Sequence, residues 1–458
     1  MIRIYNRLHK AQGLTLLYFS IIGGGIAMIK TIDIVRLFGR FNYYIATKSD
    51  GITIITGPNG FGKSTILQII NALSNSNLAF FCKLDFQKLS IEYDNGEKTT
   101  IEKNNKGIKI DNLQVPISEE CFLESMKYAQ RRPWIQKTPN GYLDRRTDEF
   151  FTEDELFYHL YLDDDRMYDF TISKSTISTN KEIRKKLDTI RSWCGDVRII
   201  SDQRLIRRKK KRSDEPQIID VISELPQSLK AEISKVSEEY SRVANSLDSS
   251  YPKRLFAAKE GIKDQREYEI CLQEANEKFA KLNQYNLVDM SIVDEKNYNP
   301  IYSTALKIYF DDFAKKYTVF QDLISKLDLF TRIINNRLTF KHISISRDSG
   351  FYIVDNDNPK KTLDLSQLSS GEKQEIVLFY DLIFSTKEKL LLLIDEPEIS
   401  LHISWQKKFL DDLLEVSKHS NVQVIVATHS PQIVSNHMDI QIDLGELYGA
   451  ELNKRKPN

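Results

Sequence analysis

The chain has 458 residues, of which 41% are hydrophobic and 28% are charged, a composition typical of a large globular protein with room for two or three domains. The formal net charge of +1 excludes a strong whole-protein attraction to nucleic acid, so any such binding has to be local. Four widely spaced cysteines without a C-x-x-C pair argue against a disulfide framework and against a zinc site, which makes the reducing cytoplasm the expected location.

Within the first 27 residues, the cationic residues Arg3, Arg7 and Lys10 precede an apolar stretch at 14–22, an arrangement that resembles a signal peptide. Three interpretations stay open: Met28 is the real start, residues 1–27 are a loosely held extension, or they anchor the chain in a membrane. The anchor is disfavoured because the apolar run is shorter than the ~20 residues that a membrane span requires.

A glycine-rich segment, Gly57-Pro-Asn-Gly-Phe-Gly-Lys-Ser64, fits the phosphate-binding pattern G-x-x-x-x-G-K-[ST]. It follows a strand-like run at 52–56 and precedes a helix-like run at 65–70, which is the context that this loop requires. Its glycines let backbone amides wrap the phosphates of ATP, Lys63 reaches the β- and γ-phosphates, and the Ser64 hydroxyl can bind Mg²⁺. The residues assigned to ATP here are Asn59, Gly60, Gly62, Lys63, Ser64 and Thr65.

The middle of the chain, residues 116–336, alternates charged and apolar residues at helical rather than strand spacing, so we expect a mainly helical insertion. Residues 227–249 and 267–287 follow this pattern and are typical of an arm or lid. The cationic block 207–212 is either a solvated loop or a patch that contacts phosphates or a partner. Two alternating runs within 337–354 predict a β-hairpin.

Two apolar runs, 390–394 and 422–427, are expected to be strands, and the first has the unbroken apolar character of a strand that is buried on both faces. Ligands of open α/β sheets bind at the carboxyl ends of the strands, which is where Asp395, Glu396 and His429 follow. Asp395 can hold Mg²⁺, Glu396 can orient the water that attacks the γ-phosphate, and His429 can contact that phosphate. The alternatives are a solvated Asp-Glu turn and an ordinary histidine.

The order of these motifs resembles that of ABC-type ATPases of the SMC, RecF and OLD branch. The matching segments are 57–64 for Walker A, 368–372 for the signature, 390–396 for Walker B, 399–402 for the D-loop and 428–430 for the switch histidine. The resemblance implies an α/β fold, namely an ABC-type P-loop ATPase head with a mainly helical insertion between its two lobes, and it implies ATP and Mg²⁺ as ligands.

Four parts are therefore expected along the chain. They are an extension at 1–27, an ATPase lobe with Walker A at 28–115, a mainly helical insertion with the candidate Q-loop strand at 116–336, and a second ATPase lobe with the remaining motifs at 337–458. The first lobe would open with the strand 29–38, as in the family that the motifs resemble.

In that family the signature contacts the γ-phosphate held by the opposite subunit. The resemblance implies this role for Ser369, Ser370 and Gly371, and it implies a homodimer that sandwiches ATP, with larger oligomers left open. The signature departs from the familiar Leu-Ser-Gly-Gly-Gln by Ser370 and Glu372. A helix that opens here presents free amides and a positive dipole end to an anion, although a plain helix cap is the alternative.

A strand-like run at 197–205 resembles the Q-loop of the same family. On that resemblance, Gln203 is assigned to contacts with ATP and Mg²⁺. The alternative is an ordinary surface glutamine.

The amino-acid sequence in and around the motifs, at 57–60, 395–402 and 427–432, resembles that of stand-alone ATPase subunits of bacterial anti-phage systems such as Septu, PARIS and certain retrons. The resemblance implies a cytoplasmic antiviral scaffold or sensor that controls a separately encoded effector, expected to be a nuclease. No nuclease activity of the chain itself and no membrane partner are expected. The alternative is a RecF-like DNA-repair ATPase, for which nucleic acid would be a partner.

Overall fold

The computed structural model describes residues 27–49, 51–104, 107–115, 117–139, 141–158, 174–200, 206–209, 217–288, 297–384, 390–419 and 422–455. The chain forms two compact units. Unit 1 comprises Met1–Asp202, Lys209–Gln217 and Thr386–Asn458, and unit 2 comprises Gln203–Arg208 and Ile218–Ser385. Of the predicted features, the extension up to residue 26, Gln203 and residues 210–212 of the cationic block lie outside the described residues.

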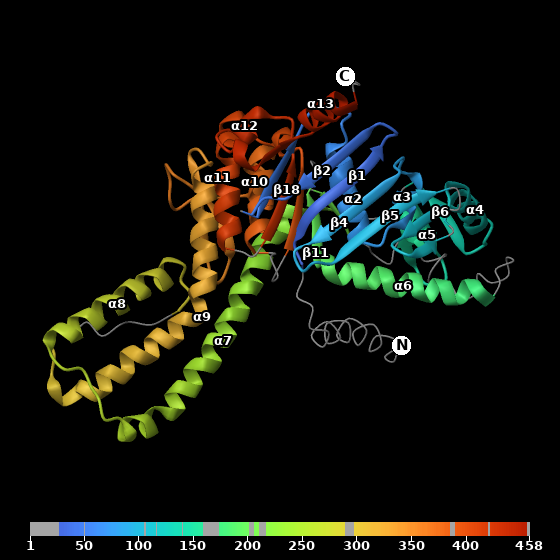
Figure 1. The fold of residues 1–458 in the computed structure, drawn as a ribbon. Helices are drawn as coiled ribbons and strands as arrows, with labels where there is room; N and C mark the ends of the chain where they lie inside the picture. Colours follow the sequence, from blue (N-terminus) through green and yellow to red (C-terminus); the bar gives the residue numbers. More distant parts are fainter. Residues whose placement is uncertain are drawn as a thin grey trace. The chain divides into compact units, whose positions relative to one another are not determined.

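Unit 1 is built on a five-stranded parallel sheet in the order β11-β17-β18-β3-β19. Figure 1 labels β11 and β18 of this sheet. Its strands are β11 Asp196–Ile200, β17 Leu390–Asp395, β18 Val422–Ala427, β3 Ile52–Thr56 and β19 Gln441–Asp443. The three central strands are buried, as their mainly apolar runs predict. Asp395 pairs with Ala427, and Ala427 pairs with Ile55, so these strands end level at one edge of the sheet.

A six-stranded antiparallel sheet, β2-β1-β4-β5-β6-β7, forms the second layer of unit 1. Its strands are β2 Phe41–Ala46, β1 Ile29–Leu37, β4 Lys88–Tyr93, β5 Lys98–Asn104, β6 Gly107–Ile110 and β7 Leu113–Val115. The predicted opening strand is therefore confirmed. Ile32 and Ile34 of β1, Ile66 of the helix after β3, and Leu393 of β17 belong to one buried hydrophobic cluster, so a single core extends through both sheets.

Gln423, within β18, joins the two sheets. Its side-chain amide donates to the carbonyl oxygen of Ile29 at 2.7 Å and accepts from the backbone nitrogen of Ile29 at 2.8 Å. Because a buried amide is costly unless its hydrogen bonds are made, this contact fixes the beginning of β1 beside the parallel sheet.

Helices and one small sheet complete unit 1. The helices are α2 Lys63–Ser74, α3 Leu78–Lys83, α4 Glu119–Gln130, α5 Glu153–Tyr158, α6 Lys174–Cys194, α11 Ile403–His419, α12 Pro431–Val434 and α13 Leu444–Arg455, with 3-10 turns η5 Pro397–Ser400 and η6 Met438–Ile440. The sheet has the order β10-β9-β8, with β8 Ile135–Thr138, β9 Gly141–Asp144 and β10 Glu149–Phe151.

The segment 116–336 is mainly helical, as predicted, and it also contains several short strands. It contains β8 to β11 and also β12 Ile206–Lys209 and β13 Gln217–Asp220, which pair in a two-stranded sheet. These strands have three to five residues each. Runs this short show too few alternations to stand out against the helical pattern of the long neighbouring segments.

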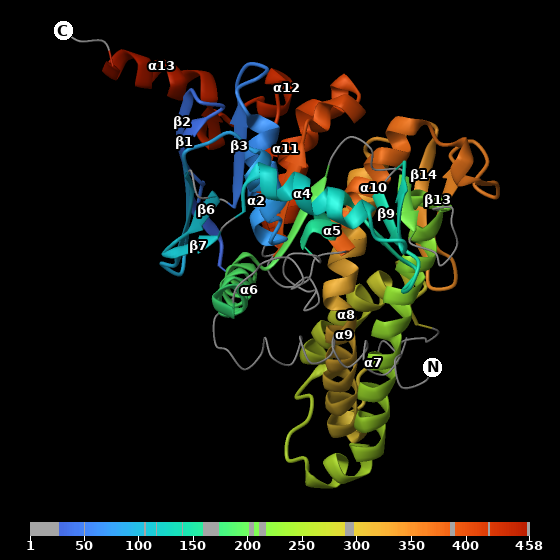
Figure 2. The ribbon, with the colours of Figure 1, turned by 90° about the vertical axis from the view of Figure 1, so that its right-hand side faces the viewer.

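Unit 2 contains the predicted helical arm (Figure 2). Its helices are α7 Val221–Ala257, α8 Gln265–Gln284 and α9 Ser303–Asn335, preceded by the turn η3 Pro300–Tyr302. Both helices predicted from the apolar spacing are confirmed, and α7 extends beyond its predicted limits at both ends. Arg254 of α7 binds both carboxylate oxygens of Asp312 in α9, at 2.6 and 2.5 Å, which ties the two neighbouring helices together.

The predicted hairpin follows α9, with β14 Lys341–Ser346, β15 Gly350–Asp355 and β16 Thr362–Leu363. The turn η4 Leu365–Gln367 then leads to α10 Ser370–Phe384, which carries the signature. The first strand begins four residues later than predicted, at residue 341 rather than 337. Arg337 instead turns inward, where its Nε lies 2.8 Å from Glu375 Oε2 of α10.

The signature segment packs with the helical arm in unit 2, whereas the predicted domains group residues 337–385 with the second ATPase lobe. The physical reason is a cluster of aromatic rings. Phe330 of α9 lies 6.1 Å from Phe351 of β15, 6.0 Å from Tyr380 and 5.5 Å from Phe384 of α10, measured between ring centroids. These contacts join the arm, the hairpin and the signature helix into one core.

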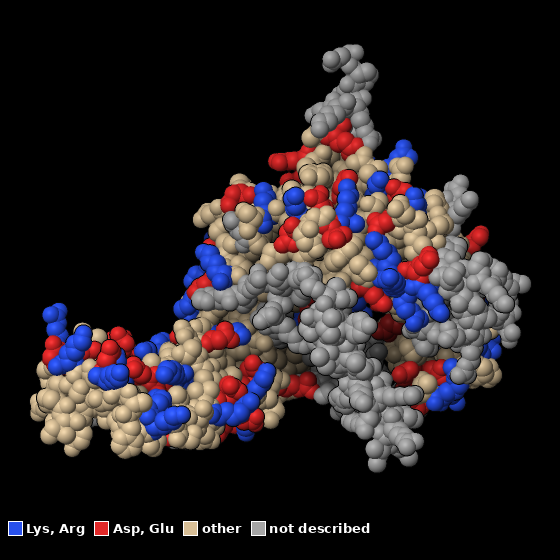
Figure 3. Space-filling model, turned by 60° about the horizontal axis from the view of Figure 1, so that its bottom comes forward, with Lys and Arg blue, Asp and Glu red and all other residues tan. Residues whose placement is uncertain are grey.

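Charged side chains of both signs are intermingled on the face drawn in Figure 3, among the residues that the structure describes. This distribution agrees with the near balance of 65 cationic and 64 anionic residues in the sequence. In the described part of the chain, no helix combines the length and the apolar character needed to cross a membrane.

Candidate active site

The glycine-rich loop lies between β3 and α2, as the motif predicts. Gly57, Gly60 and Gly62 all have positive φ angles, of 143°, 83° and 89°. At Gly62, which caps α2 in the left-handed conformation, a Cβ atom would lie 2.9 Å from a methyl carbon of Leu37. Both the backbone conformation and the close approach therefore require glycine at this position.

Lys63 is the first residue of α2 and is only 5% exposed. Its ammonium group donates to the carbonyl oxygens of Gly57 at 2.8 Å and Pro58 at 3.2 Å, so the loop curls around it. A buried cation held by neutral carbonyls keeps an uncompensated positive charge, which favours an anion. The amides at the beginning of α2 add donors for the same ligand, so the loop suits a phosphate group.

Ser64 and Asp395 meet across the edge of the sheet. The Ser64 hydroxyl donates to Asp395 Oδ1 at 2.9 Å. Burial raises the pKa of the Asp395 carboxyl, and the charges of Glu396 and Glu398 raise it further, against the lowering effects of the Ser64 hydrogen bond and of Lys63. A hydroxyl next to a carboxylate that is costly to ionise is an oxygen-rich site that fits Mg²⁺, because a divalent cation would offset the crowded negative charge.

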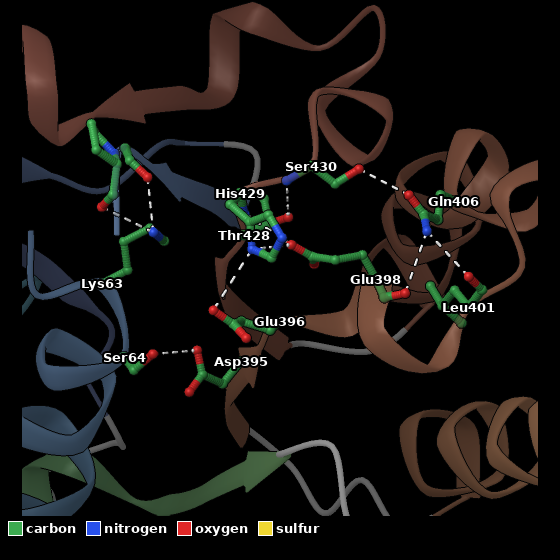
Figure 4. A network of polar contacts seen from close by, with 12 residues as sticks. Lys63, Ser64, Asp395, Glu396, Glu398, Leu401, Gln406, Thr428, His429 and Ser430 are labelled. Carbon is green, nitrogen blue, oxygen red and sulfur yellow. Dashed lines mark hydrogen bonds and ion pairs between the residues drawn. The ribbon is translucent and has the colours of Figure 1, made fainter. Parts of the chain in front are cut away.

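Glu396 adopts an unusual backbone conformation for a non-glycine residue, with φ 45° and ψ 57°. Its backbone nitrogen donates to the carbonyl oxygen of Ala427 in the neighbouring strand at 2.8 Å, which holds this conformation in place. The side chain is partly exposed, and its Oε1 lies 3.7 Å from His429 Nδ1. The turn thus separates the directions of the two adjacent carboxylates, Asp395 toward Ser64 and Glu396 toward His429 (Figure 4).

Glu398 is a site residue that the sequence analysis did not identify. Its Oε1 accepts from the backbone nitrogen of His429 at 2.9 Å and lies 3.0 Å from Nδ1 of the same residue (Figure 4). The only signal in the sequence was the second glutamate of Asp395-Glu-Pro-Glu398. Only the 3-10 turn after Asp395 brings it under His429, which is 31 positions away in the sequence.

Gln406 of α11 braces the same loops. Its side-chain nitrogen donates to the carbonyl oxygens of Glu398 at 3.3 Å and Leu401 at 3.1 Å, and its oxygen accepts from the Ser430 hydroxyl at 2.9 Å (Figure 4). Gln406 therefore links the turn after β17, through Glu398 and Leu401, to the loop after β18, through Ser430 next to His429.

The signature residues lie in unit 2. Ser369 precedes α10, and its hydroxyl accepts from the backbone nitrogen of Glu372 at 3.3 Å, while Glu372 Oε2 accepts from the nitrogen of Ser369 at 2.8 Å and its hydroxyl at 3.0 Å. Lys341 of β14 lies 3.0 Å from the same Glu372 oxygen. The helix cap expected as an alternative is thus present, and Ser369, Ser370 and Gly371 lie at the amino end of α10, where the dipole favours an anion.

A phosphate loop between a central parallel strand and a helix, with an Asp-Glu pair at the end of the second strand along, defines a P-loop ATPase of the α/β class. The family model described as an AAA ATPase domain matches residues 28–434, so the chain belongs to that family. The predicted fold class, an α/β ATPase head with a helical part between its motifs, is confirmed. Membership supports ATP as the substrate, and ATP hydrolysis as the activity.

Solved structures of SMC head domains are similar to this chain. The head with an extended coiled coil bound to the C-terminal domain of ScpA, from Pyrococcus furiosus, has 13% identity and a TM-score of 0.36, covering 94% of this chain and 100% of that chain. The head from Thermotoga maritima has 14% identity and a TM-score of 0.33, covering 90% and 92%. No curated protein matches this sequence.

Proposed function

We propose that this chain binds and hydrolyses ATP at the edge of its parallel sheet. The observation that carries the proposal is that three strand ends bring together Lys63 and Ser64, the pair Asp395 and Glu396, and His429. Phosphoryl transfer depends on positioning and on stabilisation of charge, and these side chains supply both.

Each residue has a distinct role in the proposed mechanism. The loop amides and Lys63 hold the phosphates, and Glu396 accepts a hydrogen bond from the attacking water and orients it. His429 contacts the γ-phosphate on the same side as Glu396. Mg²⁺, when bound by the Ser64 hydroxyl and the Asp395 carboxylate, would neutralise charge on the phosphates.

We test the proposal with Glu396→Gln, which keeps the size of the side chain and removes its charge. We expect kcat for phosphate release to fall by about 10²- to 10⁴-fold while ATP binding persists, because only the orientation of the water is lost. Lys63→Ala should abolish nucleotide binding itself, measured with a fluorescent ATP analogue. Glu277→Gln, on the exposed surface of α8, is the control and should change neither quantity. Full turnover in Glu396→Gln would show that the catalytic carboxylate lies elsewhere.

We also propose that ATP joins two copies of the chain, with Ser369 and Gly371 of one copy contacting the nucleotide held by Lys63 of the other. The support is the resemblance of the motifs to ABC-type ATPases, together with the placement of Ser369 and Gly371 at the amino end of a helix. Since hydrolysis would reopen the pair, Glu396→Gln should accumulate as a dimer with ATP in light scattering after gel filtration. Lys63→Ala with ATP should keep the oligomeric state that the nucleotide-free protein has.

The proposed biological role is a subunit of an anti-phage system that controls a separately encoded effector. It is supported by the resemblance of the sequence at 57–60, 395–402 and 427–432 to the ATPase subunits of such systems. Phage plating on cells that carry the gene with its native neighbours, compared between wild type and Lys63→Ala, tests this role. Loss of protection in the variant would support ATP-dependent defence. If wild type gives no protection against a broad phage panel, ATP-dependent and salt-sensitive DNA binding becomes the expected property.

A further inference from the structure

Glu398 is a buried carboxylate without an assigned role, and its side-chain contacts with the described residues are made by one oxygen. The side chain is 6% exposed, and Oε1 receives both contacts from His429. Oε2 is buried and has no hydrogen-bond partner among the described residues. A buried carboxylate oxygen without a hydrogen bond opposes folding, so the presence of Glu398 beside the nucleotide site calls for a reason other than stability.

The position of Glu398 favours one nitrogen of His429 as the carrier of the proton. Nδ1 lies 3.0 Å from Glu398 Oε1, an ion-pair distance, and a carboxylate oxygen this close favours a proton rather than a lone pair on Nδ1. The neutral ring then presents Nε2 as an acceptor. Nε2 has no partner in the described part of the chain, and the His429 side chain is 50% exposed.

Glu396 does not compete for this function. Its Oε1 lies 3.7 Å from Nδ1, which is beyond hydrogen-bond distance. Glu398 also holds the backbone nitrogen of His429, so a single oxygen fixes both the main chain and the ring of that residue. The two carboxylates therefore have different roles. Glu398 contacts the histidine, and Glu396 is available to orient the attacking water.

We propose that Glu398 is the positioning residue of His429, and that it fixes the Nδ1-protonated tautomer so that Nε2 is the nitrogen presented to the γ-phosphate and the attacking water. The effect on catalysis rests on the proposed ATPase site, whereas the tautomer does not. When the ring gains a second proton at Nε2 and donates to a phosphate oxygen, the buried charge of Glu398 faces the imidazolium from the opposite side.

The tautomer is tested by side-chain ¹⁵N NMR of the full-length protein without nucleotide, with the His429 signals assigned from their loss in His429→Gln. We expect a protonated Nδ1 in wild type and in Glu398→Gln, because the amide oxygen can accept from the His429 backbone nitrogen and lie beside Nδ1 in the same way. Glu398→Ala should lose this preference. A ring that stays protonated at Nδ1 in Glu398→Ala, or that is protonated only at Nε2 in wild type, would overturn the proposal.

Kinetics test whether Glu398 acts through His429. Glu398→Ala should lower kcat by about 10- to 100-fold and leave KM for ATP unchanged, because the phosphate loop is intact. Glu398→Gln should lose less than about tenfold. In a His429→Gln background, Glu398→Ala should cost nothing further, since its target is already absent. An equal loss in both backgrounds would assign Glu398 a role independent of the histidine.

The surface pair of Asp411 and His437 is a matched control, with His437 Nε2 at 2.7 Å from Asp411 Oδ1. Asp411→Ala should change the tautomer signals of His437 and leave ATP turnover unchanged. Failure of the ATPase proposal is recognised separately. If Lys63→Ala retains full turnover, the NMR result alone decides whether Glu398 positions the ring.

Discussion

Three carboxylates lie within the four residues 395–398 at the end of β17, and each has a different environment. Asp395 is directed to Ser64, Glu396 is partly exposed beside His429, and Glu398 is buried beneath the same histidine. Such crowding of negative charge opposes folding, but it suits a site that binds a divalent cation and a polarised water. Glu398, which the sequence analysis missed, shows that the role of a residue depends on which oxygen meets which partner.

Asp395→Asn should stabilise the protein in the absence of nucleotide and Mg²⁺. Because the folded-state pKa of Asp395 is raised, the folded state holds its proton more firmly than the unfolded state does. The contribution of the Asp395 carboxyl to the free energy of unfolding is favourable at low pH, and it is lost as pH rises from about 4 through the folded-state pKa. Thermal melts should therefore show a higher Tm for the variant at pH 7, and the gain should shrink as pH falls toward 4.

Asp348→Asn is the control for this comparison, because the Asp348 side chain is 89% exposed. Its Tm should follow that of wild type over the same pH range. A lower Tm for Asp395→Asn at pH 7 would contradict the inference that the ionised carboxylate is costly in the free protein.

At the scale of elements, the segment that follows α9 is joined to α10 by a buried ion pair close to the signature. Arg337 and Glu375 are 3% and 2% exposed, and the Arg337 guanidinium lies 4.7 Å from the centroid of the Phe379 ring. The 2.8 Å contact is aligned as an ion pair rather than as a hydrogen bond. Since α10 carries Ser369, Ser370 and Gly371 at its amino end, this pair helps to fix the signature to the base of the arm.

Breaking this ion pair on one side should cost more than removing it altogether. Arg337→Met or Glu375→Leu alone removes the ion pair but keeps one of its two buried charges, and should lower the free energy of unfolding by about 3 to 5 kcal/mol. The double variant should recover much of that loss, because neither charge remains. Urea denaturation of the full chain measures all three. Strictly additive losses would show that the two charges do not depend on each other.

At the scale of the whole molecule, the proposed ATP-binding residues are divided between the two compact units. Lys63, Asp395 and His429 belong to unit 1, and Ser369 and Gly371 belong to unit 2. A site shared between two copies would use one set from each copy, which is the proposed arrangement. Ser369 then has two functions, since it also caps α10.

Ser369→Ala should therefore have two separable effects. Loss of the helix cap should cost about 1 kcal/mol of stability, and loss of the proposed phosphate contact should abolish the ATP-dependent dimer of the Glu396→Gln protein. Ser118, which caps α4 by accepting from the Cys121 nitrogen at 3.2 Å, is a matched control. Ser118→Ala should show a similar loss of stability and a normal dimer in light scattering. Dimer formation by Ser369→Ala with ATP would contradict the proposed contact.

The sequence by itself determined the features that depend on neighbouring residues. The runs 52–56, 390–394 and 422–427 are mainly apolar, and each forms a buried strand as predicted. The phosphate loop is likewise local, because its glycines and Lys63 act within one turn of the chain. Helical periodicity over many residues was enough to predict α7 and α8.

Only the tertiary structure decided the contacts between distant parts of the chain. Glu398 reaches His429 across two strand ends, Gln423 binds Ile29 at a separation of 394 positions, and Arg337 turns inward to Glu375 instead of extending the hairpin. Each is a polar side chain that looks like a surface residue in the sequence. Its burial follows from the packing of several elements around it, and that packing depends on the whole fold rather than on local pattern.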